Sequence, residues 1–374
     1  MGDPGDPAAL LQAFLSAEGL PAGDLHGMEN EPGTGTVTGA SPFASLLISA
    51  AAGAAIATSR HSTPTGVDGI PDVAAVVFDP LGDRTEPIRL PVLPPSLSVG
   101  DWNSSWSPGE HAAAVESVRE AIARGDVYQV NVVGHQSAPF TGDPGPALRA
   151  VAGLPGAEYG AVLSGNGWSV ATGSPECLVS VSGGIVETRP IKGTRPRTAR
   201  GRAELYASAK ERAEHVMIVD LERNDLARVA ETGSVEVAEL FSLRPWCDLW
   251  QAESVVRGRL RPGVGLAELL RAVCPGGSVT GAPKRSALEL IAGIEPVGRG
   301  PSMGALGWIS AAGLDLGLTI RTVAASAGRL HLWAGGGITW GSDPEAEVAE
   351  AAAKALPVRR AIAAAATVPW PAAR

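Results

Sequence analysis

Four glutamates stand in two pairs, each pair three residues apart, in segments whose spacing predicts helices. Glu211 and Glu214 precede an apolar run, and Glu347 and Glu350 stand among alanines with Lys354 one turn further on. Residues three apart lie on roughly the same side of a helix. Carboxylates near an apolar interior need a cation, and Mg²⁺ takes one or two of them together with water and substrate oxygens. The pairs therefore fit a magnesium site, although exposed helix faces with an ordinary Glu–Lys pair fit the same spacing.

Two basic residues stand where a negatively charged ligand could meet them. Arg321 lies in a strand-like run, LTIRTV, where an arginine needs a partner such as a carboxylate. A salt bridge within the core is the alternative. Lys192 lies in the basic, proline-pinned loop 189–197, which could equally be a solvated cluster of charge.

Two glycine-rich stretches could let a ligand approach the backbone. Residues 276–284 read GGSVTGAPK and open a predicted helix, so their N–H groups could bind a carboxylate. The stretch lacks the GK[ST] ending of a phosphate-binding loop, which disfavours an ATPase. The three glycines at 335–337 follow a predicted strand. A tight turn is the alternative for each stretch.

Composition excludes several classes of protein. The chain has 374 residues, of which 45% are hydrophobic and 18% charged, and this indicates a globular protein with a large core. A net charge of -9 disfavours nucleic acid as a partner, and an anionic substrate would have to meet local cations. No apolar stretch is long enough to span a membrane; the most apolar, 43–57, is expected in the core. Three cysteines without CxxC spacing and an N-terminus without signal-peptide features predict a cytoplasmic protein.

The order of predicted elements indicates an α+β fold with antiparallel sheets, because short strands bounded by Gly or Pro alternate with helices. Asp343 and Pro344 are a helix start signal, and Pro357 is expected to break or kink that helix. Residues 91–108 read as an irregular connection. The predicted strands are 127–133, 161–163, 178–181, 185–188, 305–309, 318–323 and 330–334. The predicted helices are 111–124, 203–219, 266–273, 283–294 and 344 onward.

Nine motifs in order along the chain resemble those of the chorismate-utilising enzymes, and most of all the synthase subunits of aminodeoxychorismate synthases. They are GDVYQVN (125–131), SPE (174–176), ETRPIKGTRPR (187–197), ERAEHVMIVDLERNDLARV (211–229), GSVEV (233–237), PGGSVTGAPK (275–284), GALGWI (304–309), IRT (320–322) and AGGGI with SDPEAE (334–347). The resemblance covers roughly 106–365. We therefore expect a catalytic domain over 106–367 and a divergent segment over 1–105 packed onto the same fold.

The resemblance implies a layered α/β sandwich, with two antiparallel sheets packed between helices around a buried site for chorismate and Mg²⁺. By motif position, Glu214 and Glu350 would bind the metal directly, and Glu211 and Glu347 would assist through water. Arg321 and Lys354 would hold the substrate's carboxylates, helped by Thr194 and by the backbone around Gly337. These cations and the metal would offset the charge of a dianion in a net-acidic protein.

The resemblance also bears on the reaction. Water-using relatives carry a lysine base where this chain has Gln129, and glutamine cannot deprotonate water. Anthranilate synthases read PIAGT where this chain reads PIKGT (190–194), and the lysine is typical of aminodeoxychorismate synthases. We expect a neutral Lys192 to attack C2 of the chorismate ring while Glu176 protonates the departing C4 hydroxyl. Ammonia, supplied by a separate glutamine amidotransferase subunit, would then add at C4 and displace the lysine, giving 4-amino-4-deoxychorismate.

Two positions depart from common family patterns. Ser302 stands where relatives often carry a tyrosine, and Gln251 stands where relatives that expel pyruvate carry a histidine. The alternative enzymes are an anthranilate synthase or a 2-amino-2-deoxyisochorismate synthase. A non-catalytic chorismate-binding regulatory subunit is the alternative from another class of protein.

Overall fold

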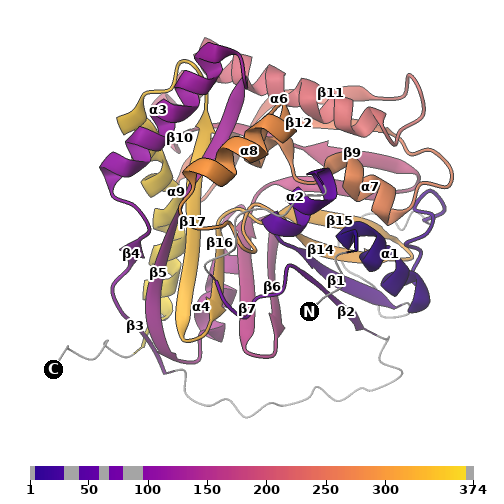
Figure 1. Ribbon diagram of the computed structural model, residues 1–374, viewed down its shortest axis with the longest axis horizontal. Helices are drawn as coiled ribbons and strands as arrows, with labels where there is room; N and C mark the ends of the chain where they lie inside the picture. The colour runs from indigo at the N-terminus through magenta and orange to yellow at the C-terminus, as the bar shows by residue number, and fades with distance from the viewer. Residues whose placement is uncertain (1–4, 29–41, 59–66, 79–95, 368–374) are drawn as a thin grey trace.

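Two antiparallel sheets form the centre of the molecule and helices cover them (Figure 1). The computed structural model describes residues 5–28, 42–58, 67–78 and 96–367. Within these ranges every strand pairing is antiparallel. The α+β sandwich expected from the sequence is confirmed.

The nine-stranded sheet joins segments from both ends of the chain, because β1 lies between β14 and β2. Residues before 105 thus complete a sheet whose other strands come from 177–318, while the expected division at residue 105 stays a prediction. The strands in spatial order are β10 (Ile191–Pro196), β12 (Leu249–Arg259), β9 (Ile185–Arg189), β8 (Cys177–Ser182), β15 (Gly313–Leu318), β14 (Ala305–Ser310), β1 (Phe43–Ile48) and β2 (Val73–Phe78), with β11 (Glu236–Trp246) paired to β12.

The eight-stranded sheet is built around the long pair β5 and β17, which stand side by side in Figure 1. Its strands in spatial order are β13 (Gly281–Ala282), β5 (Gln129–Gly142), β17 (Arg329–Ile338), β16 (Thr322–Ser326), β7 (Trp168–Ser174) and β6 (Tyr159–Gly165), with β3 (Leu97–Val99) and β4 (Asn103–Ser104) paired to β5. Side chains alternate between its two faces. Leu332 packs toward the helices, whereas Trp333 packs into the apolar cluster shared with the other sheet.

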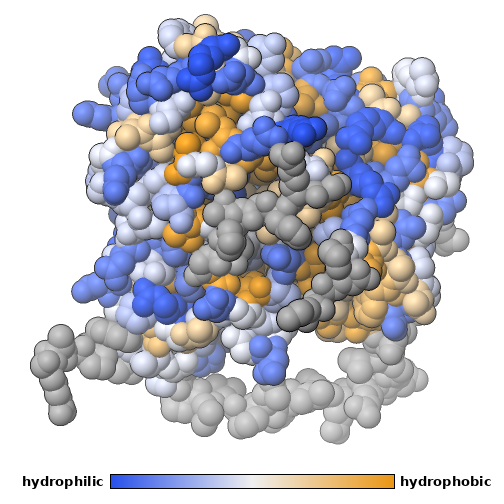
Figure 2. All heavy atoms as spheres, in the orientation of Figure 1, coloured by the Kyte–Doolittle hydropathy of each residue, from blue (hydrophilic) through white to orange (hydrophobic). Residues whose placement is uncertain are grey.

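The helices form layers outside the sheets. The described helices are α1 (Pro7–Ala17), α2 (Ala50–Thr58), α3 (Pro108–Arg124), α4 (Gly145–Ala152), α5 (Ala199–Ala207), α6 (Ala209–Ala227), α7 (Leu266–Val273), the 3-10 helix η1 (Gly277–Val279), α8 (Lys284–Ile294) and α9 (Pro344–Ala365). Helices α4 and α9 pack on the eight-stranded sheet, and α1 and α7 contribute to the larger core around the nine-stranded one. None of the described helices is long and apolar enough to cross a membrane. Hydrophilic residues dominate the top of the face in Figure 2, over α3 and α6.

Local signals place the starts of two helices that frame the molecule. Ser107 and Glu110 form a reciprocal capping box at the start of α3, and Gly125 ends that helix in a left-handed conformation. Asp343 caps α9 as expected, by accepting from the backbone N–H of Ala346. Of the two outcomes expected at Pro357, a break does not occur, since α9 continues to Ala365; a kink there stays a prediction.

Four predictions from sequence differ from the structure. The predicted helix 203–219 is two helices, α5 and α6, separated at Ser208, whose hydroxyl caps α6. The predicted strand 318–323 is interrupted, since β15 ends at Leu318 and β16 begins at Thr322. The glycines 335–337 lie inside β17 rather than after a strand. The segment 91–108 contains β3 and β4, although its part before residue 96 lies outside the described residues.

A buried pair of histidines makes stability depend on pH. His135 Nε2 on β5 and His331 Nδ1 on β17 lie 3.1 Å apart and both side chains are buried. Burial, together with the nearby charge of Arg329, lowers the pKa of each to about 4. The unfolded chain therefore takes up protons below a pH of about 6.5 while the folded chain does not.

We predict that stability falls between a pH of about 6.5 and about 4, by at most ~1.4 kcal/mol per pH unit for each histidine. The double variant H135Q/H331Q should lose less stability over this interval, as measured by urea unfolding at successive pH values. His26→Gln, at an exposed position, is the control and should keep the wild-type slope. Equal slopes in the wild type and the double variant would contradict the prediction.

Candidate active site

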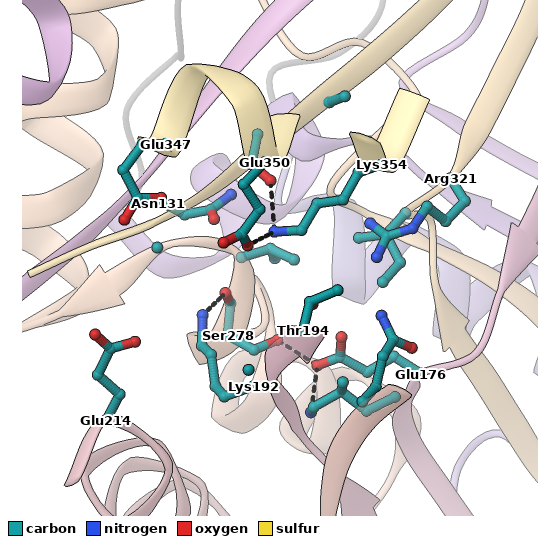
Figure 3. A pocket seen from close by; sticks show the side chains of 18 of the residues that line it. Asn131, Glu176, Lys192, Thr194, Glu214, Ser278, Arg321, Glu347, Glu350 and Lys354 are labelled. Atoms are coloured by element: carbon teal, nitrogen blue, oxygen red, sulfur yellow. Dashed lines mark hydrogen bonds and ion pairs between the residues drawn. The ribbon is translucent and has the colours of Figure 1, made fainter. Parts of the chain in front are cut away.

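One pocket brings together all ten residues singled out from the sequence. It lies where β10, α6, β17 and α9 meet (Figure 3), and the space between its walls, open solvent at the mouth included, is about 780 Å³. The predicted residues that line it are Glu176, Lys192, Thr194, Glu211, Glu214, Arg321, Gly337, Glu347, Glu350 and Lys354. They are separated by up to 178 positions in the chain but share one cavity. Their roles stay predictions at this point.

Lys192 points into this pocket from an irregular part of β10. The register with β12 shifts between Lys192 and Thr194, and Gly193 has a φ of 79°. A Cβ on Gly193 would lie 2.9 Å from Leu205 and 3.0 Å from the Glu211 carboxylate, so the bulge needs glycine. The Lys192 amine donates to the carbonyl oxygen of Ser278 at 2.8 Å. Burial lowers the pKa of Lys192, and this effect is opposed in part by Glu176 and Glu214.

Glu176 lies on the other side of the same serine. Its carboxylate accepts hydrogen bonds from the Ser278 hydroxyl at 2.5 Å and from the backbone N–H of Ile191 at 3.2 Å. Only 3% of the residue is exposed. Burial raises the pKa of Glu176, although these hydrogen bonds and the nearby Lys192 act in the opposite direction. A partly buried amine with a lowered pKa and a buried acid with a raised pKa therefore stand on either side of Ser278 (Figure 3).

Ser278 was missed by the sequence reasoning. Residues 276–284 drew attention only for their backbone N–H groups, whereas in the structure the contacts come from the carbonyl and hydroxyl oxygens of one serine. A buried polar residue inside a glycine-rich turn was the available signal. Asn131, Lys210, Gln251 and Met303 also line the pocket.

Arg321 is a buried cation without a carboxylate partner among the described residues. It does not lie in mid-strand as predicted: it stands between β15 and β16 with a φ of 51°. Its guanidinium lies 4.7 Å from the centre of the Trp246 ring, and its Nε has no hydrogen-bond partner in the described part of the chain. Burial lowers its pKa to about 10, against the influence of Glu176 and Glu350. The core salt bridge considered from the sequence is not present, and the guanidinium faces the pocket (Figure 3). An anionic ligand would supply the missing partner.

The three glycines of β17 form a wall that has no room for side chains. A Cβ on Gly335 would lie 1.8 Å from the carbonyl oxygen of Val132, and one on Gly337 would lie 2.3 Å from Gln129 Nε2 and 3.0 Å from Lys192 Nζ. Lys354 donates to the carbonyl oxygen of Gly335 at 3.0 Å. The glycines therefore let β17 approach the side chains that the pocket presents, which is their function in place of a turn.

The two glutamate pairs face each other from α6 and α9. Lys210 lies between them, 3.7 Å from Glu214 and 4.0 Å from Glu347. Glu214 accepts from the Thr339 hydroxyl, and Glu347 accepts from the Ser342 hydroxyl. The remaining two carboxylates have closer cations: Arg195 lies 3.0 Å from Glu211, and Lys354 lies 2.6 Å from Glu350. The Glu–Lys pair allowed by the sequence spacing thus exists within the pocket.

The donor set fits a hard cation such as Mg²⁺. Burial raises the pKa of Glu214 and Glu347, and the neighbouring Glu211 and Glu350, respectively, raise it further. These carboxylates are therefore short of positive charge. No three acidic, histidine or cysteine side chains among the described residues already converge as a metal site. Mg²⁺ needs only one or two carboxylates when water and substrate oxygens complete its shell. Glu214 and Glu350 are enough in number, but Glu350 is already paired with Lys354, which lowers its pKa, so a metal there would compete with that lysine.

Comparisons with known proteins agree with this geometry. Residues 73–360 match the model of a protein family described as chorismate binding enzyme. The chain is 37% identical over 272 residues to aminodeoxychorismate synthase component 1 of Bacillus subtilis, covering 71% of this chain and 58% of that protein. It is 41% identical over 276 residues to anthranilate synthase component 1 of Streptomyces coelicolor, covering 71% of this chain and 54% of that protein. The chain thus spans somewhat more than half the length of these curated relatives.

Solved structures show the same fold. Anthranilate synthase component I of Streptococcus pneumoniae superposes with a TM-score of 0.74 at 28% identity, covering 89% of this chain and 84% of that one. The menaquinone-specific isochorismate synthase of Escherichia coli superposes with a TM-score of 0.64 at 20% identity, covering 73% of this chain and 65% of that one, and supports the fold alone. On the match over 73–360 and the shared architecture, this chain belongs to the family of chorismate-binding enzymes.

Proposed function

We propose that this chain converts chorismate and ammonia to 4-amino-4-deoxychorismate. The observation that carries the proposal is Lys192, a partly buried amine of lowered pKa that shares the pocket, and a contact to Ser278, with a buried acid of raised pKa, Glu176. Chorismate carries a ring carboxylate and an enolpyruvyl carboxylate. The unpartnered Arg321 and the nearby Lys354 are suited to bind them, with Thr194 and the backbone around Gly337 lining the remaining wall.

Each proposed step uses a group of the chain in the protonation state that burial favours. Neutral Lys192 attacks C2 of the ring, the double bonds shift, and the C4–O bond breaks as Glu176 gives its proton to the hydroxyl, which leaves as water. Ammonia then adds at C4, the bond between C2 and the lysine nitrogen breaks, and a proton from the new ammonium group returns to Glu176, so both the amine and the acid are restored. The sum is chorismate plus ammonia giving aminodeoxychorismate plus water. Mg²⁺ held by Glu214 and Glu350, with Glu211 and Glu347 assisting, would withdraw charge from the ring carboxylate.

Residues near the pocket weigh against the rival reactions. Gln129 is fully buried and neither polar atom of its side chain has a hydrogen-bond partner among the described residues. An amide there cannot act as the base that hydroxyl transfer needs. Gln251 lines the pocket where relatives that expel pyruvate carry a histidine. Anthranilate synthesis remains the second candidate because the Streptomyces coelicolor relative is 41% identical.

Ammonia would come from a separate glutamine amidotransferase subunit. All three cysteines of the chain are free, and burial raises the pKa of each thiol, that of Cys274 to about 12. A glutaminase nucleophile needs the opposite shift toward the thiolate. The relatives' names, component 1, accord with a second subunit.

The first prediction concerns the product and Lys192. With chorismate, Mg²⁺ and an ammonium salt the chain should form 4-amino-4-deoxychorismate, identified by mass and by conversion with a lyase, and glutamine alone should not replace ammonium. Lys192→Ala should lower 4-amination by about 100-fold or more, or redirect the amine to C2, because the covalent step is lost. Arg200→Ala, at an exposed position on α5, is the control. Unchanged 4-amination by the lysine variant would exclude the covalent route.

The second prediction concerns the pH profile. Because the active form of Lys192 is neutral, the rate should rise with pH through its lowered pKa. Because the active form of Glu176 is protonated, the rate should fall as pH passes its raised pKa. Glu176→Gln should lower kcat by about 10²–10⁴-fold and remove the falling limb, while the Kd for chorismate changes little. The exposed Glu204→Gln should keep both limbs; a falling limb that survives in E176Q would assign it to another group.

The third prediction concerns the metal. Chelation by EDTA should abolish turnover, and added Mg²⁺ should restore it. Glu214→Gln and Glu350→Gln should each weaken Mg²⁺ binding in the presence of chorismate by at least about 10-fold, measured by calorimetry, because each removes a charged oxygen donor. Glu345→Gln, exposed on the first turn of α9, is the matched control. Turnover that is insensitive to EDTA would refute a magnesium requirement.

A further inference from the structure

A cluster of buried charges lies beneath the pocket and does not line it. Glu222 and Asp225 lie three residues apart on α6, and 2% and 4% of them are exposed. Lys284, the first residue of α8, lies 2.5 Å from the Asp225 carboxylate and donates to the carbonyl oxygen of Val273 at 3.1 Å. The proposed reaction uses none of these three groups, and none of them lines the pocket.

Glu222 connects this cluster to η1. Its Oε1 accepts the backbone N–H of Gly277 at 3.2 Å. A Cβ on Gly277 would lie 2.5 Å from Leu221 Cδ2 and 3.0 Å from Glu222 Oε1, so η1 lies directly against this part of α6. The next residue is Ser278, whose carbonyl oxygen binds Lys192 and whose hydroxyl binds Glu176.

Keeping Glu222 buried is costly, so its contact with η1 requires an explanation. Its second oxygen, Oε2, has no hydrogen-bond partner among the described residues. Burial raises the pKa of Glu222, and the neighbouring Asp225 raises it further. An apolar side chain of similar volume would avoid this cost. Such a side chain could not, however, accept the hydrogen bond from the backbone N–H of Gly277.

We propose that Glu222 is a positioning residue: supported by the ion pair between Asp225 and Lys284, it fixes η1 so that Ser278 holds Lys192 and Glu176 in their working positions. The proposal rests on the proposed function for the roles of those two residues. The proposed role of Glu222 depends on its position and not on its charge, because η1 needs an acceptor for the backbone N–H of Gly277.

Steady-state consumption of chorismate with ammonium and Mg²⁺ tests the proposal in five variants: E222A, E222Q, S278A, the double variant E222A/S278A, and D220N. Glu222→Ala should lower kcat by about 10–100-fold with KM within about 3-fold, the range for groups that support a catalytic residue. Glu222→Gln keeps the acceptor and should stay within about 3-fold of the wild type. Ser278→Ala removes the hydroxyl contact to Glu176 but keeps the carbonyl that binds Lys192. In that background E222A should therefore cost less than it does in the wild type, because one of the two contacts that η1 holds is already lost. Asp220→Asn, exposed on the same helix, is the matched control.

Hydrogen exchange gives a second readout that does not depend on turnover. Backbone amides of 276–280 should exchange at least about 10-fold faster in E222A and at the wild-type rate in E222Q. Four outcomes would each overturn the proposal. On turnover, these are equal kcat in E222A and the wild type, equal losses of kcat in E222A and E222Q, or losses of kcat in E222A and S278A that add fully in the double variant. On hydrogen exchange, it is faster exchange spread over both sheets. Consumption of chorismate can be measured whichever product forms. If the wild type makes another product, the proposed function is wrong, but this test of Glu222 remains valid.

Discussion

The partial burial of Lys192 is the constraint on which the rest of the proposed site depends. An amine in water is protonated and cannot attack carbon, whereas burial lowers its pKa and frees the lone pair. Burial raises the pKa of Glu176, so the same pocket shifts both groups in the directions that the proposed nucleophile and acid need. Ser278 contacts both groups through different oxygens. A second link is the hydrogen bond from the backbone N–H of Ile191, the residue before Lys192, to Glu176.

Backbone geometry, more than side-chain size, shapes the space around this amine. The bulge at Gly193 turns β10 toward the pocket, and Gly337 leaves room on β17 where any Cβ would meet Lys192 and Gln129. Arg321 takes up a left-handed conformation between two strands and so places its guanidinium in the pocket. Such conformations are costly and persist only where the surrounding structure enforces them. Here the enforcement comes from two sheets that pack into one core.

How much of the structure can be predicted from the sequence depends on how far apart in the chain the interacting residues are. Capping at Ser107 and Asp343 is local, so the starts of α3 and α9 follow from a few residues. The ten pocket residues were identified through motif resemblance, and their side-by-side positions agree with it. The break at Arg321, the contacts of Ser278 and the role of Glu222 are set by residues far away in the chain, such as Trp246 and Lys192. No local pattern carries that information.

Overall similarity to relatives also says little about which carbon is aminated. Relatives named for aminodeoxychorismate and for anthranilate synthesis are 37% and 41% identical to this chain, so overall identity does not separate the two reactions. The two products differ in where ammonia adds to the same ring. A nucleophile that occupies C2 leaves C4 as the open position, and one residue in the β10 bulge can supply it. We therefore expect regiochemistry to follow Lys192 rather than overall identity.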